Sequence, residues 1–128
     1  TRFKPCSFDE LLATADVLSI NIPAAPENKY LFNAAMFSKM KKGSYLVNAS
    51  RGSLVDSVAL AAALKSVHLS GAALDVIDGE PASADNPLLN NPQVLLTPHV
   101  AYLSQFTQKA YITVQAQNVI DFYNEKAG

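Results

Sequence analysis

The stretch "GSYLVNASRGSLVD", residues 43–56, carries the pattern that decides the fold. Its apolar run at 45–47 predicts a short strand, and the lack of alternation favours a strand buried on both faces. A strand that only needs to turn can end on Gly, Asn or Asp. This one ends on the polar cluster Asn48-Ala49-Ser50-Arg51. An arginine directly after a buried strand indicates either a structural ion pair or a binding site.

Short helices and apolar strands alternate on both sides of this stretch. Ser7, Asn33 and Asp56 are typical helix N-caps, and Gly43 suits the residue after a helix. The segment 21–28 holds two prolines, which predicts irregular structure. We expect helices at about 8–15, 34–42, 57–66 and 104–124, and strands at about 17–20, 44–48, 72–76 and 94–97. This alternation predicts an α/β fold, a parallel sheet covered by helices.

The composition excludes several classes of function. A net charge of −1 gives no basis for binding nucleic acid or an anionic membrane surface. No apolar run approaches the roughly 20 residues of a membrane span. Cys6 is the single cysteine, so we expect no internal disulfide and no cysteine-based zinc site. We therefore expect a cytoplasmic protein without a metal.

Polar side chains follow each predicted strand. Right-handed crossovers place the carboxyl ends of parallel strands at one edge of the sheet, where ligands bind in open α/β folds. Each such residue alone is weak evidence, but their arrival at one edge favours a shared site. The residues at this edge are Asn21, Asn48 to Arg51, Asp75, Asp78, Glu80, Thr97 and His99.

Three of these side chains make chemical sense as a unit. The planar guanidinium of Arg51 can hold a carboxylate through two parallel hydrogen bonds. The imidazole of His99 both donates and accepts a proton near neutral pH. A carboxylate such as Glu80 beside it would fix its tautomer and favour the imidazolium. Together they suit proton transfer on an anionic substrate.

Three segments resemble the C-terminal signatures of the NAD-dependent D-isomer-specific 2-hydroxyacid dehydrogenases. They are "LVNASRGSLVD", "LSGAALDVIDGEP" and "NPQVLLTPHV", preceded by the similar stretch "VLSINIPAAPENKYLFN". The resemblance spans nearly all of residues 7–103. It implies an enzyme that reversibly reduces a 2-oxo acid to a D-2-hydroxy acid by hydride transfer, with the small-molecule acid as its partner.

The resemblance also assigns roles to residues. It implies that Arg51 binds the substrate carboxylate, that His99 is the acid/base, and that Glu80 pairs with His99. It implies that Asp75 contacts the nicotinamide carboxamide. The positions that it places at the cofactor are Ile22, Pro23, Ala49, Arg51, Asp75 and His99.

The first half of a dinucleotide fold is missing from the pattern. Neither a GxGxxG turn nor the acidic residue that binds the adenosine ribose occurs, so NAD is implied but NADP is not excluded. We expect residues 1–103 to be part of an NAD-binding (Rossmann) domain and 104–128 to be a closing helix. We expect the chain to be cut from a longer protein, to be inactive alone, and to form a homodimer.

Two other readings stay open. A dehydrogenase-like module, similar to transcriptional corepressors, would bind NAD without turnover. A structural α/β domain of the phosphate-receiver type would need carboxylates after its early strands, whereas Asp16 precedes a strand and Asn21 follows it. Turnover of small 2-oxo acids by the full-length protein would separate the first reading from an enzyme.

Overall fold

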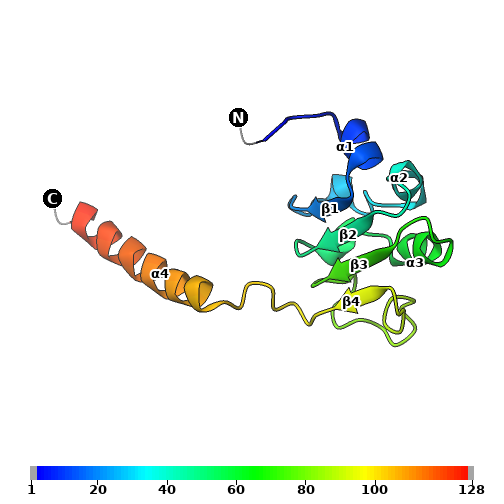
Figure 1. Cartoon of the computed structure of the whole chain (residues 1–128). Coiled ribbons are helices and arrows are strands. Elements are labelled where there is room, and N and C mark those ends of the chain that lie inside the picture. The colour runs from blue at the N-terminus through cyan, green and yellow to red at the C-terminus, as the bar shows by residue number, and fades with distance from the viewer. Residues whose placement is uncertain (1–2, 127–128) are drawn as a thin grey trace.

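The computed structural model describes residues 3–126 as one layer of strands with helices beside it, followed by a long separate helix (Figure 1). The sheet has four parallel strands in the order β1-β2-β3-β4. The α-helices are α1 (Phe8–Thr14), α2 (Ala34–Lys39), α3 (Ser57–Lys65) and α4 (Gln105–Lys126). The strands are β1 (Val17–Ile20), β2 (Tyr45–Asn48), β3 (Gly71–Leu74) and β4 (Val94–Leu96). The predicted parallel α/β fold is therefore confirmed.

The helix N-caps are the ones that the sequence predicts. Ser7 Oγ accepts the N–H of Glu10, Asn33 Oδ1 accepts those of Ala35 and Met36, and Asp56 Oδ1 accepts those of Val58 and Ala59. These bonds satisfy N–H groups that a helix leaves without partners. The first residues of α1, α2 and α3 are therefore set by the capping side chains that precede them.

The second helix is shorter than predicted. We expected it to reach Lys42, but α2 ends at Lys39, and the Lys41 N–H donates to the carbonyl of Leu12 in α1. Gly43 adopts the left-handed conformation expected of a glycine, at φ 84°, but in the turn that enters β2. Docking of the chain against α1 therefore overrides the local helical pattern.

The 21–28 segment also departs from expectation. It was predicted to be irregular, yet a short 3-10 helix, η1 (Pro26–Asn28), forms within it. Pro26 opens this helix, where its missing N–H costs nothing. Asn28 closes it by accepting the Ala25 N–H and donating to the Pro23 carbonyl.

The sheet is covered on one face only. Leu18, Ile20 and Leu46 are buried in a single hydrophobic cluster with residues of α1, α2 and α3. On the opposite face Val17, Ser19 and Tyr45 are exposed and Val47 is partly buried, and Tyr45 keeps 50 % of its surface. The prediction that the second strand is buried on both faces is therefore wrong for this chain, because all three helices lie on the same side.

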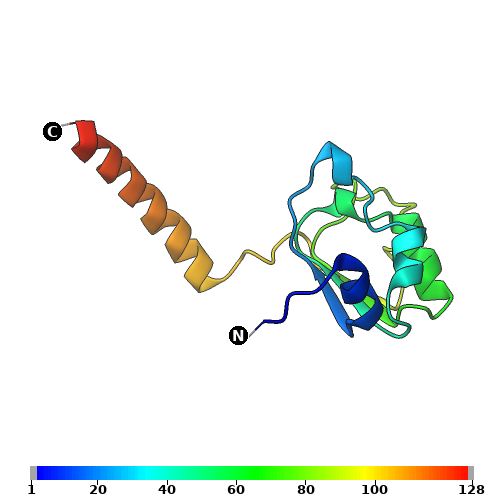
Figure 2. The same cartoon turned by 90° about the horizontal axis from the view of Figure 1, so that it is seen from above.

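The last helix stands apart from the sheet. α4 is joined to β4 by an extended segment and projects away from the strands in both views (Figures 1 and 2). None of its described residues is buried, so the helical stripe of Ile112, Ala116, Val119 and Tyr123 is not covered by any other part of residues 3–126. Across the same residues, no helix combines the length and the apolar character needed to cross a membrane.

Candidate active site at the carboxyl edge of the sheet

The strand register brings the predicted site residues to one edge. Ile20, Asn48, Leu74 and Leu96 lie side by side across the four strands as each strand ends. The chain then enters the loops that carry Arg51, Glu80 and His99. The inference that these residues share the carboxyl edge is therefore supported by the pairing itself.

The polar cluster after β2 forms a fixed turn, which we call the arginine turn (residues 48–52). Asn48 is 0 % exposed; its Nδ2 donates to the Arg51 carbonyl at 2.9 Å and its Oδ1 accepts the Ser50 N–H at 3.0 Å. A buried amide with both ends bonded fixes the backbone that it bridges. This explains why an apolar strand ends on a polar cluster: Asn48 holds the backbone that carries Arg51.

A glycine packs the arginine turn against the loop after β3. A Cβ added to Gly52 would lie 2.0 Å from the carbonyl carbon of Ile77, far inside any allowed contact. Only glycine permits this approach of two backbones. The contact places the arginine turn beside the loop that leads from Ile77 to Glu80.

The guanidinium of Arg51 is exposed. Its Nη1 donates to the Ser50 carbonyl at 2.7 Å, and within residues 3–126 no ion pair joins Arg51 to a carboxylate. The structure therefore places Arg51 in the loop next to Glu80 but gives it no contact with Glu80 or His99.

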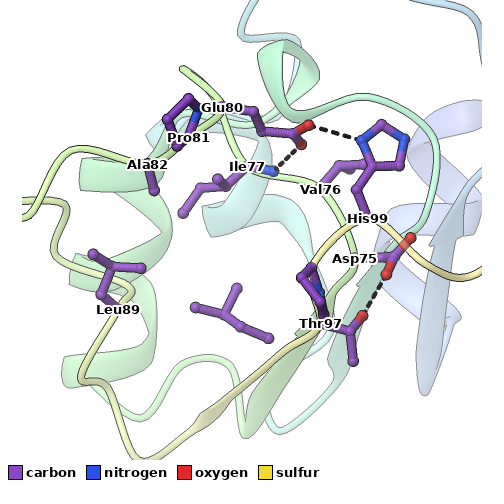
Figure 3. A pocket seen from close by; sticks show the side chains of 11 residues that line it. Asp75, Val76, Ile77, Glu80, Pro81, Ala82, Leu89, Thr97 and His99 are labelled. Carbon is purple, nitrogen blue, oxygen red and sulfur yellow. Dashed lines mark hydrogen bonds and ion pairs between the residues drawn. The ribbon is translucent and has the colours of Figure 1, made fainter.

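Glu80 and His99 form a direct pair. His99 Nδ1 lies 2.7 Å from Glu80 Oε2, and the other carboxylate oxygen accepts the Ile77 N–H at 3.1 Å (Figure 3). With Nδ1 donating to the carboxylate, Nε2 is the ring nitrogen left to exchange a proton with a ligand. The predicted carboxylate–imidazole contact is thus present.

The pair is partly open to solvent, with the side chains of His99 and Glu80 45 % and 39 % exposed. The hydrogen bond from His99 lowers the pKa of Glu80 below its usual range, against a smaller opposing effect of burial. The Ile77 N–H adds to the lowering. Glu80 is therefore a carboxylate at neutral pH.

Asp75 lies below this pair and is 7 % exposed. Its carboxylate accepts hydrogen bonds from the Thr97 hydroxyl at 2.5 Å and from the N–H groups of Val100 and Ala101 at 2.9 and 2.8 Å. Burial raises the pKa of Asp75, but these hydrogen bonds outweigh it and leave the pKa below its usual range. The carboxylate that the resemblance places at the nicotinamide is thus engaged with the loop of His99.

A cavity of about 480 Å³ opens beside the pair. Its polar wall is formed by Asp75, Glu80, Thr97 and His99, and Arg51 does not line it. Figure 3 shows the imidazole above Asp75, with Pro81 and Leu89 on the far side of the hollow. The cavity lining is otherwise mostly apolar: Val76, Ile77, Pro81, Ala82, Leu89, Leu96 and Pro98.

The remaining predicted cofactor positions lie at the ends of β1 and β2. Ile22, Pro23 and Ala49 are exposed, and the Ser50 hydroxyl donates to the Ile22 carbonyl at 2.5 Å. This bond ties the two loops together and leaves an apolar surface at the sheet edge. Such a surface fits the uncharged face of a nicotinamide ring. Within residues 3–126 no cluster of His, Cys, Asp or Glu could hold a metal ion.

Sequence reasoning missed the residues that hold the loops. Gly52 looked like an isolated glycine, and its position directly after the arginine was the available signal. Tyr30 donates to Asp78 Oδ2 at 2.5 Å across 48 positions, a contact that no local pattern reveals. Asp78, to which no catalytic role was assigned, thus anchors the loop after β3.

Known proteins match this chain over most of its length. The family model "D-isomer specific 2-hydroxyacid dehydrogenase, NAD binding domain" matches residues 1–101. A glyoxylate/hydroxypyruvate reductase B of Citrobacter koseri is 40 % identical over 116 residues, which are 91 % of this chain and 36 % of the relative. A 4-methyl-2-oxopentanoate reductase A of Aspergillus oryzae is 45 % identical over 103 residues, 80 % of this chain and 31 % of the relative.

A solved structure agrees with these relatives. The crystal structure of D-lactate dehydrogenase with NAD+ from Lactobacillus jensenii superposes with a TM-score of 0.84 at 29 % identity, covering 94 % of this chain and 40 % of that one. The chain thus spans less than half the length of each of these proteins. It belongs to the D-isomer specific 2-hydroxyacid dehydrogenases, through their NAD binding domain.

Proposed function

We propose that this chain carries the acid/base and anion-binding half of an active site for the NAD-dependent, reversible reduction of a 2-oxo acid to a D-2-hydroxy acid. The observation that supports this most strongly is the 2.7 Å contact between His99 and Glu80, made beside the arginine turn at the carboxyl edge of the sheet. The membership in a dehydrogenase family supports the same reaction. The complete polypeptide that contains this segment is proposed to be the enzyme.

The roles follow from the chemistry of the side chains. Arg51 binds the carboxylate of the 2-oxo acid and stabilises the charge that develops on its keto oxygen. Protonated His99 gives the proton on Nε2 to that oxygen, while Glu80 fixes the ring and stabilises the imidazolium. The bound reduced cofactor supplies the hydride to the keto carbon. In the reverse direction His99 accepts the proton of the alcohol.

The cofactor is proposed to lie across the ends of β1, β2 and β3. Ile22, Pro23 and Ala49 would contact the nicotinamide ring, with Arg51 and His99 facing it from the substrate side. Asp75 has one carboxylate oxygen with a single donor, Ala101 N–H, so that oxygen retains capacity to accept the carboxamide N–H. NAD is the cofactor that the family description names.

Cofactor oxidation tests this proposal. The complete polypeptide should oxidise NADH with at least one acid from a panel of glyoxylate, hydroxypyruvate, pyruvate and 4-methyl-2-oxopentanoate, chosen from the substrates named for its relatives and neighbour. The product should be the D-alcohol on chiral chromatography. NADH binding without oxidation by any acid would instead favour the corepressor-like module, which these relatives do not support.

We also propose that the complete protein works as a homodimer in the cytoplasm. The exposed face of the sheet and the exposed apolar side chains of α4 support association, because such surfaces are unfavourable in water. The free thiol of Cys6 is compatible with a reducing compartment. Light scattering at several protein concentrations tests the dimer, and a constant monomer mass would contradict it.

A further inference from the structure

We propose that Thr97 is a positioning residue: through the carboxylate of Asp75 it holds the histidine loop (residues 97–101) in the conformation that presents His99 to the substrate. This inference rests on the proposed function, in which His99 exchanges a proton with the substrate. The hydrogen bonds that carry it are independent of the reaction.

The backbone of His99 needs an external restraint. Its φ is 56°, in the left-handed region that non-glycine residues rarely adopt. Such a conformation is unfavourable for a residue with a side chain and persists only where surrounding contacts impose it. In this conformation the His99 ring lies against Glu80, with Nδ1 at 2.7 Å from Oε2.

Asp75 supplies this restraint from two directions. Its backbone carbonyl accepts the His99 N–H at 2.9 Å. Its side chain accepts the N–H groups of Val100 and Ala101, the two residues that follow the histidine. Asp75 therefore binds the backbone N–H of His99 itself and the N–H groups of the two residues after it.

Thr97 fixes the orientation of that carboxylate. Its hydroxyl donates to Asp75 Oδ1, the same oxygen that accepts the Val100 N–H, while its own backbone N–H stays bonded to Leu74 in the sheet. Asp75 is buried, so the loss of a hydrogen-bond donor to its carboxylate is costly. Without the hydroxyl, the carboxylate would rotate and loosen its bonds to both amides.

Thr97→Val tests the inference, because it removes the donor and keeps the shape. Thr97→Ser restores the hydroxyl, and Thr14→Val is a matched control whose hydroxyl bonds within α1. The first readout is hydrogen exchange in a peptide that contains Val100 and Ala101, measured on the complete polypeptide. We expect exchange about tenfold faster in Thr97→Val, near the parent rate in Thr97→Ser, and unchanged in Thr14→Val. Equal exchange in all variants would overturn the inference.

The second readout separates positioning from general destabilisation. Thr97→Val should lower kcat for the 2-oxo acid about tenfold and leave KM within about twofold, because carboxylate binding by Arg51 is untouched. Thr97→Ser should recover kcat. A parent with no turnover on any 2-oxo acid would defeat the proposed function, while the exchange measurement would still decide the role of Thr97. Faster exchange with an unchanged kcat would overturn the positioning role.

Discussion

The arginine turn and the histidine loop hold their backbones in the same way but treat their functional side chains differently. Each follows a strand, and each is fixed by one buried polar residue, Asn48 in the first and Asp75 in the second. The imidazole of His99 has a charged partner in Glu80, whereas the guanidinium of Arg51 is exposed and, among residues 3–126, donates only to the carbonyl of Ser50.

This difference matches what the two groups are proposed to do. A proton donor must have a defined ring orientation before the substrate arrives, so its partner belongs to the protein. An anion-binding group with a protein carboxylate already bound would have to give it up, which would weaken substrate binding. If these roles hold, the proton side of the site is organised before the substrate binds, and within residues 3–126 Arg51 has no carboxylate partner to give up.

Replacing His99 and replacing Arg51 should change different kinetic constants. His99→Gln should lower kcat about 10³-fold with little change in KM, because the proton donor is lost. Arg51→Gln should instead raise KM for the 2-oxo acid about 10²-fold, because a bidentate partner of the carboxylate is lost. Steady-state kinetics on the complete polypeptide checks both. Identical effects on kcat and KM in the two variants would contradict the division of roles.

The contact between the arginine turn and the loop after β3 should be sensitive to a single methyl group. Gly52→Ala should lower the free energy of unfolding by about 3 kcal/mol, since the new Cβ overlaps the backbone of Ile77. Gly79→Ala is the control: its Cβ would enter open space, and only its φ of 75° costs about 1 kcal/mol. Urea denaturation measures both, and equal losses would show that the approach at Gly52 is not tight.

The buried amide of the arginine turn gives a smaller effect. Asn48→Asp replaces the donor to the Arg51 carbonyl with an oxygen, which should cost about 2 kcal/mol of stability at this buried position. Asn21→Asp, at an exposed asparagine, should change stability by less than about 0.5 kcal/mol. If the two variants unfold at the same urea concentration, Asn48 does not hold the turn.

The sequence predicted the order of the elements and the contact of Glu80 with His99. Caps and apolar runs mark the elements, whereas the pairing of Glu80 with His99 was implied by the resemblance to the dehydrogenase family and by the shared edge of the parallel strands. The exposure of one face of the sheet was not predictable. The apolar residues at 45–47 predict a buried strand whether or not a second layer covers Tyr45. The early end of α2 was not predictable either, because it depends on a backbone contact with Leu12.

The restraints on the site were the least visible part of the sequence. Asp75 and Thr97 were recognised as polar residues at the sheet edge, but nothing local shows that they bond each other across 22 positions. The close approach of Gly52 to Ile77 likewise depends on two loops meeting in space. Residue types therefore indicated the chemistry of the site, whereas contacts between distant segments determine how the loops of Arg51 and His99 are held.

The pH dependence of ketone reduction in the parent and in Glu80→Gln tests the central pairing most directly. The hydrogen bond with His99 lowers the pKa of Glu80 below its unfolded-state pKa of about 4.3. Glu80 is therefore ionised at every pH above about 4.3. It is charged through the neutral range, and this charge is lost only as pH falls through the folded pKa of Glu80. In Glu80→Gln the charge is absent, so kcat/KM should fall at a pH about one unit lower than in the parent. Superimposable profiles would contradict the account.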